Sequence, residues 1–297
     1  MGLFPGFADK RLAVNGVEIQ AVVGGSGPPL LLLHGAPQSH VMWHHIAPRL
    51  AERFTVVATD LRGYGDSSKP PGGGDHADYS FRTMTADQVA VMKQLGHNSF
   101  SVVAHDRGAR VTHRMLLDHP EAVTRAALLD IVPTKYVYDH TDRALATAYF
   151  HWFFFIQPAP LPETLITASP DFFLKTKMAS QTKSGTLEAI DSRALQHYLA
   201  PFRDPSRVHA MCEDYRAGAY ADYEIDKADV AAGKKITIPM LALWGDAGIA
   251  SVAATPLDTW KQWATNVRGS PVDSGHFLAE ENPDETARLL RAFFLEG

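Results

Sequence analysis

The sequence of 297 residues contains a single cysteine, Cys212, so no disulfide can form within the chain. It has no excess of basic charge, because 28 Lys and Arg residues stand against 33 Asp and Glu residues and give a formal net charge of −5. Its longest strongly apolar run, Phe150 to Ile156, is far shorter than the roughly 20 residues that cross a bilayer. These absences exclude a membrane-spanning segment and give no reason to expect nucleic acid or an anionic membrane as partner. Small molecules become the default ligands.

Residues Met1 to Lys10 also lack the apolar stretch of a signal peptide, which together with the lone cysteine favours a reducing, cytoplasmic location. Hydrophobic residues make up 45% of the chain and charged residues 21%, as in ordinary globular proteins. At roughly 150 residues per domain, the length allows one large domain or a core with a sizeable insertion.

The first half of the chain alternates between short apolar runs and amphipathic segments. Residues 11–23 form two apolar-rich segments joined by Asn15-Gly16, a pair typical of a type I′ hairpin turn. Leu30 to Leu33 is a wholly apolar run that ends at a turn, as in a strand buried on both faces of a parallel sheet. The alternation predicts a doubly wound α/β sheet, with helices over 41–52, 83–95 and 108–118 and strands over 54–59, 100–104 and 125–129.

The pattern changes after Pro133 to aromatic-rich, helix-compatible sequence without a clear strand. We interpret residues 134–226 as a helical cap domain inserted into a core domain made of residues 1–133 and 227–297. The apolar run Met240 to Trp244 resumes the sheet. It is followed by a predicted helix over 255–264, a weak strand near Pro271 and a closing helix over 283–294.

The segment Val102 to Arg110 carries the clearest chemical signal, because an apolar strand runs straight into a helix with small residues at Ala104 and Gly108 around Asp106. In a strand-turn-helix elbow the nucleophile has a strained backbone, and its neighbours two positions away must be small. Taken alone, Asp106 is equally well explained as the cap of the following helix.

Three further segments follow the order expected of such an elbow. The backbone N–H of Ala36, after the Leu30–Leu33 strand, and that of Arg107 are the predicted oxyanion-hole donors. Asp130 follows the predicted strand 125–129 at the carboxyl edge of the sheet, where ligands bind in such folds. His276 lies just before the last helix, where a general base is expected. Each has an ordinary explanation as a turn, a cap or a solvated side chain, and their conjunction is what favours catalysis.

With these segments the sequence resembles the α/β-hydrolase superfamily and, within it, the haloacetate (fluoroacetate) dehalogenases, over nearly the whole chain. The matching motifs are Gly24-Gly25-Ser26-Gly27-Pro28, Asp60-Leu61-Arg62-Gly63-Tyr64-Gly65, His105-Asp106-Arg107-Gly108, Leu129-Asp130-Ile131-Val132-Pro133-Thr134, His151-Trp152, Gln157-Pro158-Ala159-Pro160 and Cys212-Glu213-Asp214-Tyr215-Arg216-Ala217-Gly218.

An aspartate nucleophile attacks an sp³ carbon and forms an alkyl ester, so alkyl halides, haloacids or epoxides are the expected substrates. Haloalkane dehalogenases and epoxide hydrolases of similar sequence usually have Trp after the nucleophile, where this chain has Arg107. Arg107 and Arg110 lie three apart and can share a helix face, so we expect both to bind a substrate carboxylate, although Arg110 could instead pair with a surface acid. The resemblance assigns the halide site to His151, Trp152 and Tyr215, whose ring N–H and O–H groups are donors.

The triad acid has two candidates. Many relatives carry it in a Gly-x-x-Asp turn after a later strand, but this chain has Gly248 at that position and Asp246 two residues earlier. We therefore predict Asp130, with Asp246 as the alternative. Two further departures from the family pattern, Ala36 for a common Phe and Gln181 for a frequent Trp, bear on the width of the pocket.

The resemblance implies hydrolysis of fluoroacetate or chloroacetate to glycolate and halide through an ester on Asp106, without metal or other cofactor, in a homodimer. An epoxide hydrolase or a broader 2-haloacid dehalogenase remains the alternative, as does a non-catalytic ligand receptor of the same fold. A metal site at His40 and His44, four residues apart, is disfavoured because no carboxylate stands nearby at ligand spacing.

Overall fold

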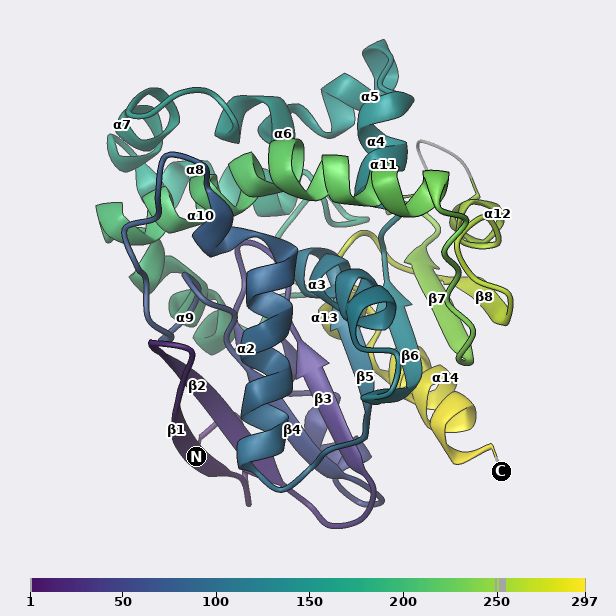
Figure 1. Cartoon of the computed structure of the whole chain (residues 1–297). Helices are drawn as coiled ribbons and strands as arrows, with labels where there is room; N and C mark the ends of the chain where they lie inside the picture. Colours follow the sequence, from purple (N-terminus) through teal and green to yellow (C-terminus); the bar gives the residue numbers. More distant parts are fainter. Residues whose placement is uncertain (1, 249, 251–254, 297) are drawn as a thin grey trace.

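The computed structural model describes residues 2–248, 250 and 255–296. Within them, eight strands form one sheet in the order β1-β2-β4-β3-β5-β6-β7-β8 (Figure 1). The β1/β2 and β2/β4 pairs are antiparallel, and every pair from β4/β3 onward is parallel. The strands are β1 (Ala8–Val14), β2 (Val17–Gly24), β3 (Pro29–Leu33), β4 (Thr55–Thr59), β5 (Phe100–His105), β6 (Val123–Leu129), β7 (Met240–Gly245) and β8 (Val267–Val272).

The N-terminal hairpin and the buried parallel strands confirm the sequence prediction. Asn15 and Gly16 join β1 to β2 with φ angles of 47° and 78°, the positive pair that a type I′ turn requires. All four leucines of Leu30–Leu33 are inaccessible to solvent. Such strands occur where helices cover both faces of a sheet.

The core helices lie on the two faces of this sheet. Helices α2 (Phe81–Gln94) and α3 (Asp106–Asp118) pack together in front of it in Figure 1. Helices α1 (Ala47–Leu50) and α14 (Pro283–Leu295) pack against each other on the opposite face. The remaining core helices are short: η1 (His40–Trp43), η2 (Ala77–Tyr79), α12 (Pro256–Trp260) and α13 (Leu278–Glu281).

The single helix predicted over 41–52 is wrong. The chain forms η1 (His40–Trp43) and then α1 (Ala47–Leu50), separated by a turn. Pro48 explains the break, because it has no N–H for a helical hydrogen bond and is tolerated only in the first turn, where α1 carries it.

Between β6 and β7 the chain is helical, and the structure describes all of residues 134–226 without a strand. In Figure 1 these helices lie across the upper end of the sheet. Helix α11 crosses the predicted boundary at residue 226, and the division into core and cap domains stays a proposal. The helices are α4 (Thr134–Asp139), α5 (Arg143–Ala148), α6 (Phe150–Phe155), α7 (Leu161–Thr167), α8 (Pro170–Ala179), α9 (Ser192–Phe202), α10 (Pro205–Ala217), η3 (Gly218–Asp222) and α11 (Tyr223–Ala231).

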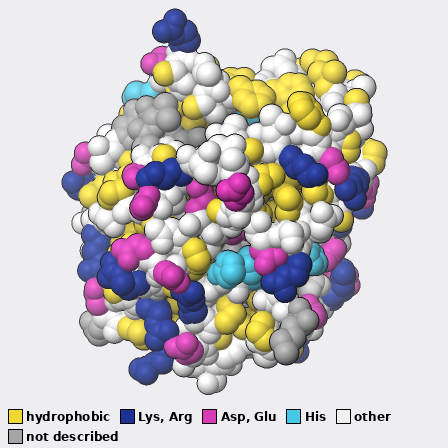
Figure 2. All heavy atoms as spheres, turned by 180° about the vertical axis from the view of Figure 1, so that it is seen from behind, with side chains coloured by type: hydrophobic (Ala, Val, Ile, Leu, Met, Phe, Trp, Pro, Cys, Tyr) yellow, Lys and Arg dark blue, Asp and Glu magenta, His cyan; other side chains and the backbone are white. Residues whose placement is uncertain are grey.

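The surface is mixed in charge. On the face seen in Figure 2, acidic and basic side chains are interspersed, most densely over its middle and lower parts. Among the described residues, no helix combines the length and the apolar character needed to cross a bilayer.

Candidate active site

Asp106 lies at the junction between β5 and α3, with a φ angle of +44° that L-residues rarely adopt. Neighbouring positions must be small to allow this turn. A Cβ on Gly108 would lie 2.5 Å from the carbonyl oxygen of His34, and one on Gly35 would overlap the Asp106 side chain. This is the elbow geometry that the small residues around Asp106 predicted.

The Asp106 carboxylate is buried and held at one oxygen. Its Oδ2 accepts a hydrogen bond of 2.9 Å from the backbone N–H of Ala36, while no hydrogen bond to Oδ1 is formed by any described residue. Burial would raise the pKa of Asp106, but electrostatic interaction with His276 and His105 in their protonated forms, and with the Arg110 and Arg107 guanidinium groups, holds that pKa below its ordinary range. The carboxylate is therefore ionised, with Oδ1 available for attack.

His276 and Asp130 form a pair beside this elbow. The Nδ1 of His276 lies 2.5 Å from Asp130 Oδ2, and Asp130 Oδ1 accepts the backbone N–H of Gly245 at 3.0 Å. Asp130 follows β6 with a φ of +49°, which turns its side chain towards the loop after β8. Burial raises the pKa of Asp130, although the hydrogen bond from His276 opposes this rise. The pairing fixes the imidazole so that Nε2 is left for proton transfer.

The alternative acid, Asp246, is not part of this pair. Its carboxylate accepts hydrogen bonds from Lys183 Nζ at 2.7 and 2.8 Å at the protein surface. Gly248 leaves room for the acid that follows β6, since a Cβ at that position would overlap the Asp130 carboxylate. The chain accommodates one acid beside His276, and the structure places Asp130 there.

His105 contacts the backbone of the base, His276. Its Nε2 lies 2.8 Å from the carbonyl oxygen of His276, and the two rings are 4.5 Å apart. Burial, together with the charge of His276, lowers the pKa of His105 to about 3. A neutral His105 donates its Nε2 proton to that carbonyl and helps to fix the main chain of the base.

Arg107 is paired with an acid that the sequence analysis did not single out. Its Nε and Nη2 donate to the two carboxylate oxygens of Asp214 at 2.8 and 2.5 Å, and Nη2 also donates to the Asp214 carbonyl. The Tyr64 hydroxyl donates to Asp214 Oδ2 at 2.6 Å. All three side chains are buried. Two of the three guanidinium nitrogens, Nε and Nη2, are thus already hydrogen-bonded to Asp214 of the cap.

Arg110 differs from Arg107 in having no acidic partner among the described residues. Its Nη1 donates to the carbonyl of Val132 and the hydroxyl of Thr134, each at 3.0 Å, and its buried Nε has no partner. Burial lowers the pKa of Arg110, an effect that the Asp106 charge opposes. A guanidinium stays protonated under such conditions, so Arg110 is a buried cation that forms no ion pair with any described residue, although the Asp106 charge acts on it.

The three residues expected to hold halide lie together on the cap side of the site. His151 and Trp152 on α6 each have their ring 6.0 Å from that of Tyr215 on α10. The guanidinium carbon of Arg107 lies 4.2 Å from the Tyr215 ring, and that of Arg110 lies 4.4 Å from the Trp152 ring. Burial, with the nearby Lys177 ammonium, lowers the pKa of His151 well below its ordinary value, so its ring is neutral and keeps one N–H donor.

Lys177 is a residue that the sequence analysis missed. It lies on α8, 6% exposed, and its Nζ donates to Gln181 Oε1 at 2.7 Å. Burial lowers the pKa of Lys177 to about 8, while the charge of Asp106 opposes this. Gln181, the departure from the frequent Trp, therefore accepts a hydrogen bond from a further buried cation, Lys177, on which the charge of the nucleophile acts. A lone lysine in a helix gives no sequence signal for such a position.

The two histidines weighed as metal ligands have other partners. His40 Nδ1 lies 2.8 Å from Asp60 Oδ1, and His44 Nδ1 lies 2.9 Å from the carbonyl of Val41. Within residues 2–248, 250 and 255–296, no group of three or more His, Cys, Asp or Glu side chains is arranged to hold a metal ion.

Known proteins resemble this chain over nearly its full length. Residues 28–283 match the family model described as the alpha/beta hydrolase fold. A fluoroacetate dehalogenase from a Burkholderia species is 45% identical over 295 residues, which cover 99% of this chain and 96% of the relative. The chain belongs to the haloacetate dehalogenase family of the α/β-hydrolase superfamily. As a member of that family it is a hydrolase that acts on carbon–halide bonds.

Two other proteins similar to this chain lie below and above that level of identity. A soluble epoxide hydrolase from Corynebacterium sp. strain C12 is 31% identical over 284 residues, 95% of each chain. A solved α/β-hydrolase structure from Nostoc sp. PCC 7120 is 49% identical, covers 98% of this chain and 99% of its own, and superposes with a TM-score of 0.95. The epoxide hydrolase is thus clearly more distant than the dehalogenase.

Proposed function

We propose that this enzyme converts fluoroacetate or chloroacetate to glycolate and halide through a glycolyl ester on Asp106. The observation that carries the proposal is Arg110: a buried guanidinium that forms no ion pair with any described residue and interacts with the ionised nucleophile suits a substrate that carries a carboxylate. The 45% identical fluoroacetate dehalogenase supports the same substrate class.

In the first step, Asp106 Oδ1 forms a bond to the α-carbon of the haloacetate and the carbon–halogen bond breaks, with its electron pair leaving on the halide. Arg110 holds the substrate carboxylate, assisted by the nitrogen of Arg107 that Asp214 does not occupy. The neutral ring of His151, with Trp152 and Tyr215, donates hydrogen bonds to the halide as its charge develops.

In the second step, His276 removes a proton from water, and the resulting hydroxide attacks the carboxyl carbon of Asp106. The carbonyl oxygen of the ester, Oδ2, becomes negative in this step. It already accepts the N–H of Ala36, and the N–H of Arg107 is the proposed second donor. Collapse of the tetrahedral intermediate breaks the ester C–O bond, and the departing glycolate oxygen takes the proton back from His276. The regenerated Asp106 carboxyl then loses its proton to solvent and is again a carboxylate. Asp130 stabilises the imidazolium that forms on His276.

Halide release tests this function directly. Purified enzyme is incubated with fluoroacetate and chloroacetate at neutral pH, and free halide is measured against time. We expect release from at least one, abolished in Asp106→Asn. Release of chloride alone would make the enzyme a broader haloacid dehalogenase, whereas turnover of epoxides without release from either haloacetate would contradict the proposal.

Three expectations remain predictions: assembly as a homodimer, a cytoplasmic location, and the division into a core (1–133 and 227–297) and a cap (134–226). The oxyanion role of the Arg107 N–H also belongs to the proposal.

A further inference from the structure

The loop that carries His276 is held by an unusual set of acceptors. Three consecutive backbone N–H groups each find one: Gly275 N–H donates to Glu281 Oε2 at 2.9 Å, His276 N–H to the carbonyl of Gln181 at 2.8 Å, and Phe277 N–H to Glu281 Oε1 at 2.9 Å. One carboxylate therefore grips the main chain on both sides of the proposed general base.

The same carboxylate reaches the cap. Glu281 Oε2 also accepts the backbone N–H of Lys183, at 2.8 Å, two residues after Gln181. Gly275 fits so closely against this cap segment that a Cβ on it would lie 2.5 Å from both the Gln181 carbonyl oxygen and the Lys183 nitrogen. The cap segment and the base loop are in direct contact at this point.

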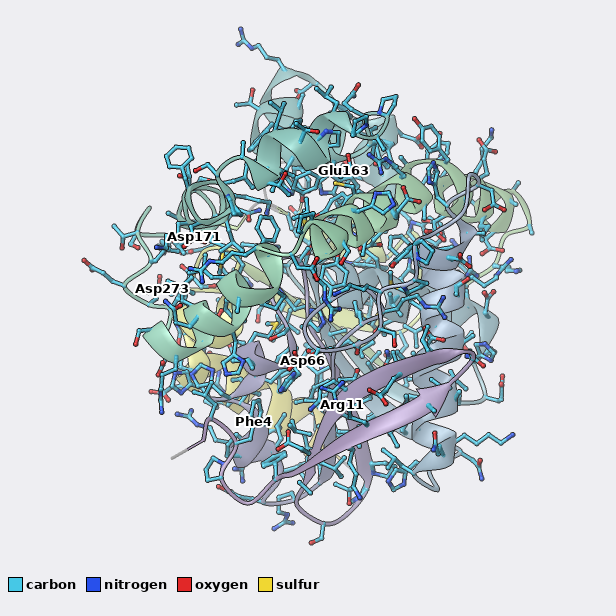
Figure 3. All side chains as sticks on the ribbon, turned by 90° about the vertical axis from the view of Figure 1, so that its left-hand side faces the viewer. Phe4, Arg11, Asp66, Glu163, Asp171 and Asp273 are labelled. Carbon is cyan, nitrogen blue, oxygen red and sulfur yellow. The ribbon has the colours of Figure 1, made fainter. Side chains whose placement is uncertain are left out.

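The Lys183 side chain closes the contact from outside. Its Nζ donates to Asp273 Oδ1 at 2.5 Å, as well as to the Asp246 carboxylate. Asp273 begins the loop that leads to His276 and is labelled in Figure 3, where the yellow C-terminal ribbon adjoins the green cap. These outer ion pairs are solvent-exposed and contribute little by themselves, so the inner carboxylate of Glu281 is the main anchor.

Such an anchor matters because the imidazole can rotate only about the bonds that join it to this main chain. The distance of 2.5 Å between His276 Nδ1 and Asp130 is kept only while the backbone at Gly275 to Phe277 stays in place. Hydrogen bonds to an ionised carboxylate are stronger than those to neutral acceptors, and Glu281 accepts three of them.

We propose that Glu281 is a positioning residue for His276, and that through its hydrogen bond from Lys183 it makes the position of the base depend on the docked cap. The inference rests on the proposed two-step function, in which His276 acts only on the ester. Loss of Glu281 therefore slows ester hydrolysis and leaves displacement of halide unchanged.

The test uses Glu281→Gln in the full-length enzyme. The glutamine amide has only one acceptor oxygen. In either orientation its NH₂ group therefore faces the backbone N–H of Gly275 or of Phe277, and that hydrogen bond is lost. We expect kcat for chloroacetate to fall by tenfold to about 100-fold, the effect of a displacement of about 1 Å. The first-turnover burst of chloride keeps the rate of the wild type, and intact-mass spectrometry shows a glycolyl adduct on Asp106 during turnover.

Two reference variants separate the possible outcomes. His276→Ala reports on the proposed function, because a failure to trap the ester in this variant overturns the two-step route itself. If His276→Ala accumulates the ester but Glu281→Gln does not, or loses burst and turnover in equal measure, the positioning role is wrong. Glu285→Gln, which removes a surface carboxylate paired with Arg288 on the next helix, is the matched control and should behave as wild type.

Glu281→Asp covers the case in which the glutamine variant does not fold. It keeps the charge but is one methylene too short to reach Gly275 and Phe277 together. We expect the same ester accumulation, and normal turnover without it would contradict the proposal.

Discussion

The two walls of the active site are built differently. On the core wall, backbone geometry does the positioning: Asp106 and Asp130 both have positive φ angles at strand ends, and the Ala36 N–H holds the nucleophile. On the cap wall, side-chain pairs do it, as Arg107 with Asp214 and Lys177 with Gln181. Backbone geometry at the strand ends thus positions the nucleophile and the acid, while side-chain pairs between distant segments shape the substrate site.

The largest effect should come from the core wall. Asp130→Asn leaves His276 without its anionic partner, and we expect kcat to fall by about 10⁴-fold, as when the acid of a catalytic triad becomes an amide. Steady-state halide release measures this loss. Asp246→Asn removes one of the two acidic partners of Lys183 and keeps an amide oxygen that can accept the Ser274 N–H, so it should retain near-normal activity. Equal losses in the two variants would contradict the assignment of Asp130.

On the cap wall, Asp214→Asn should act mainly on stability. It leaves the Arg107 guanidinium buried without its counter-ion, which costs about 3–5 kcal/mol of the free energy of unfolding. Urea denaturation followed by circular dichroism measures the change. Asp171→Asn breaks an exposed pair with Arg203 and should change stability little. An Asp214 variant as stable as the wild type would show that this wall is not held by the pair.

Arg110→Met should act mainly on substrate binding. Loss of its charged hydrogen bonds to a carboxylate raises the activation free energy by about 1.5–3 kcal/mol. This lowers kcat/KM for chloroacetate roughly 10- to 150-fold. The matched control is the neutral analogue chloroacetamide, whose slower turnover should be affected much less. A similar loss with both substrates would mean that Arg110 shapes the site without binding the carboxylate.

Glu280, which joins the two walls, should make the stability of the protein depend on pH. Tyr198 of the cap donates to its Oε1 at 2.9 Å, and Gln38 of the oxyanion loop donates to its Oε2. Burial raises the pKa of Glu280 from 4.5 to about 8, with the charges of Glu281 and Asp191 adding to the rise.

Because this pKa is raised, the folded protein binds a proton that the unfolded chain releases above pH 4.5. The stability from that proton is complete below pH 4.5 and is lost as the pH rises to about 8. We therefore expect the Tm of the wild type to fall more steeply than that of Glu280→Gln between pH 5 and 8. Parallel Tm curves for the two proteins would contradict a protonated Glu280.

The core wall could be predicted from sequence because its signals are local. An apolar run that ends in Asp106 between small residues, or in Asp130 at a strand end, encodes its own geometry within a few positions. The broken helix at Pro48 shows the limit even there, since the apolar spacing over 41–52 favoured one helix and a single proline in the middle decided otherwise.

The cap wall could not be predicted in the same way because its pairs join distant segments. Asp214 is 107 positions from Arg107, and nothing near either residue indicates the other. The motif around Tyr215 indicates the helix that carries the partner, but the motif alone does not indicate that Asp214 pairs with Arg107. From the sequence, both arginines are expected to bind the substrate carboxylate. In the structure Nε and Nη2 of Arg107 are hydrogen-bonded to Asp214, whereas Arg110 forms no ion pair with any described residue.

The most direct test of the account is a single turnover in ¹⁸O-water with enzyme in excess over chloroacetate, followed by mass spectrometry of the peptide that contains Asp106. Hydroxide that attacks the ester carbonyl leaves its oxygen in the regenerated carboxylate, so we predict label in Asp106 and unlabelled glycolate. Label in glycolate with none in Asp106 would mean that water displaces the halide directly, and would contradict the covalent route.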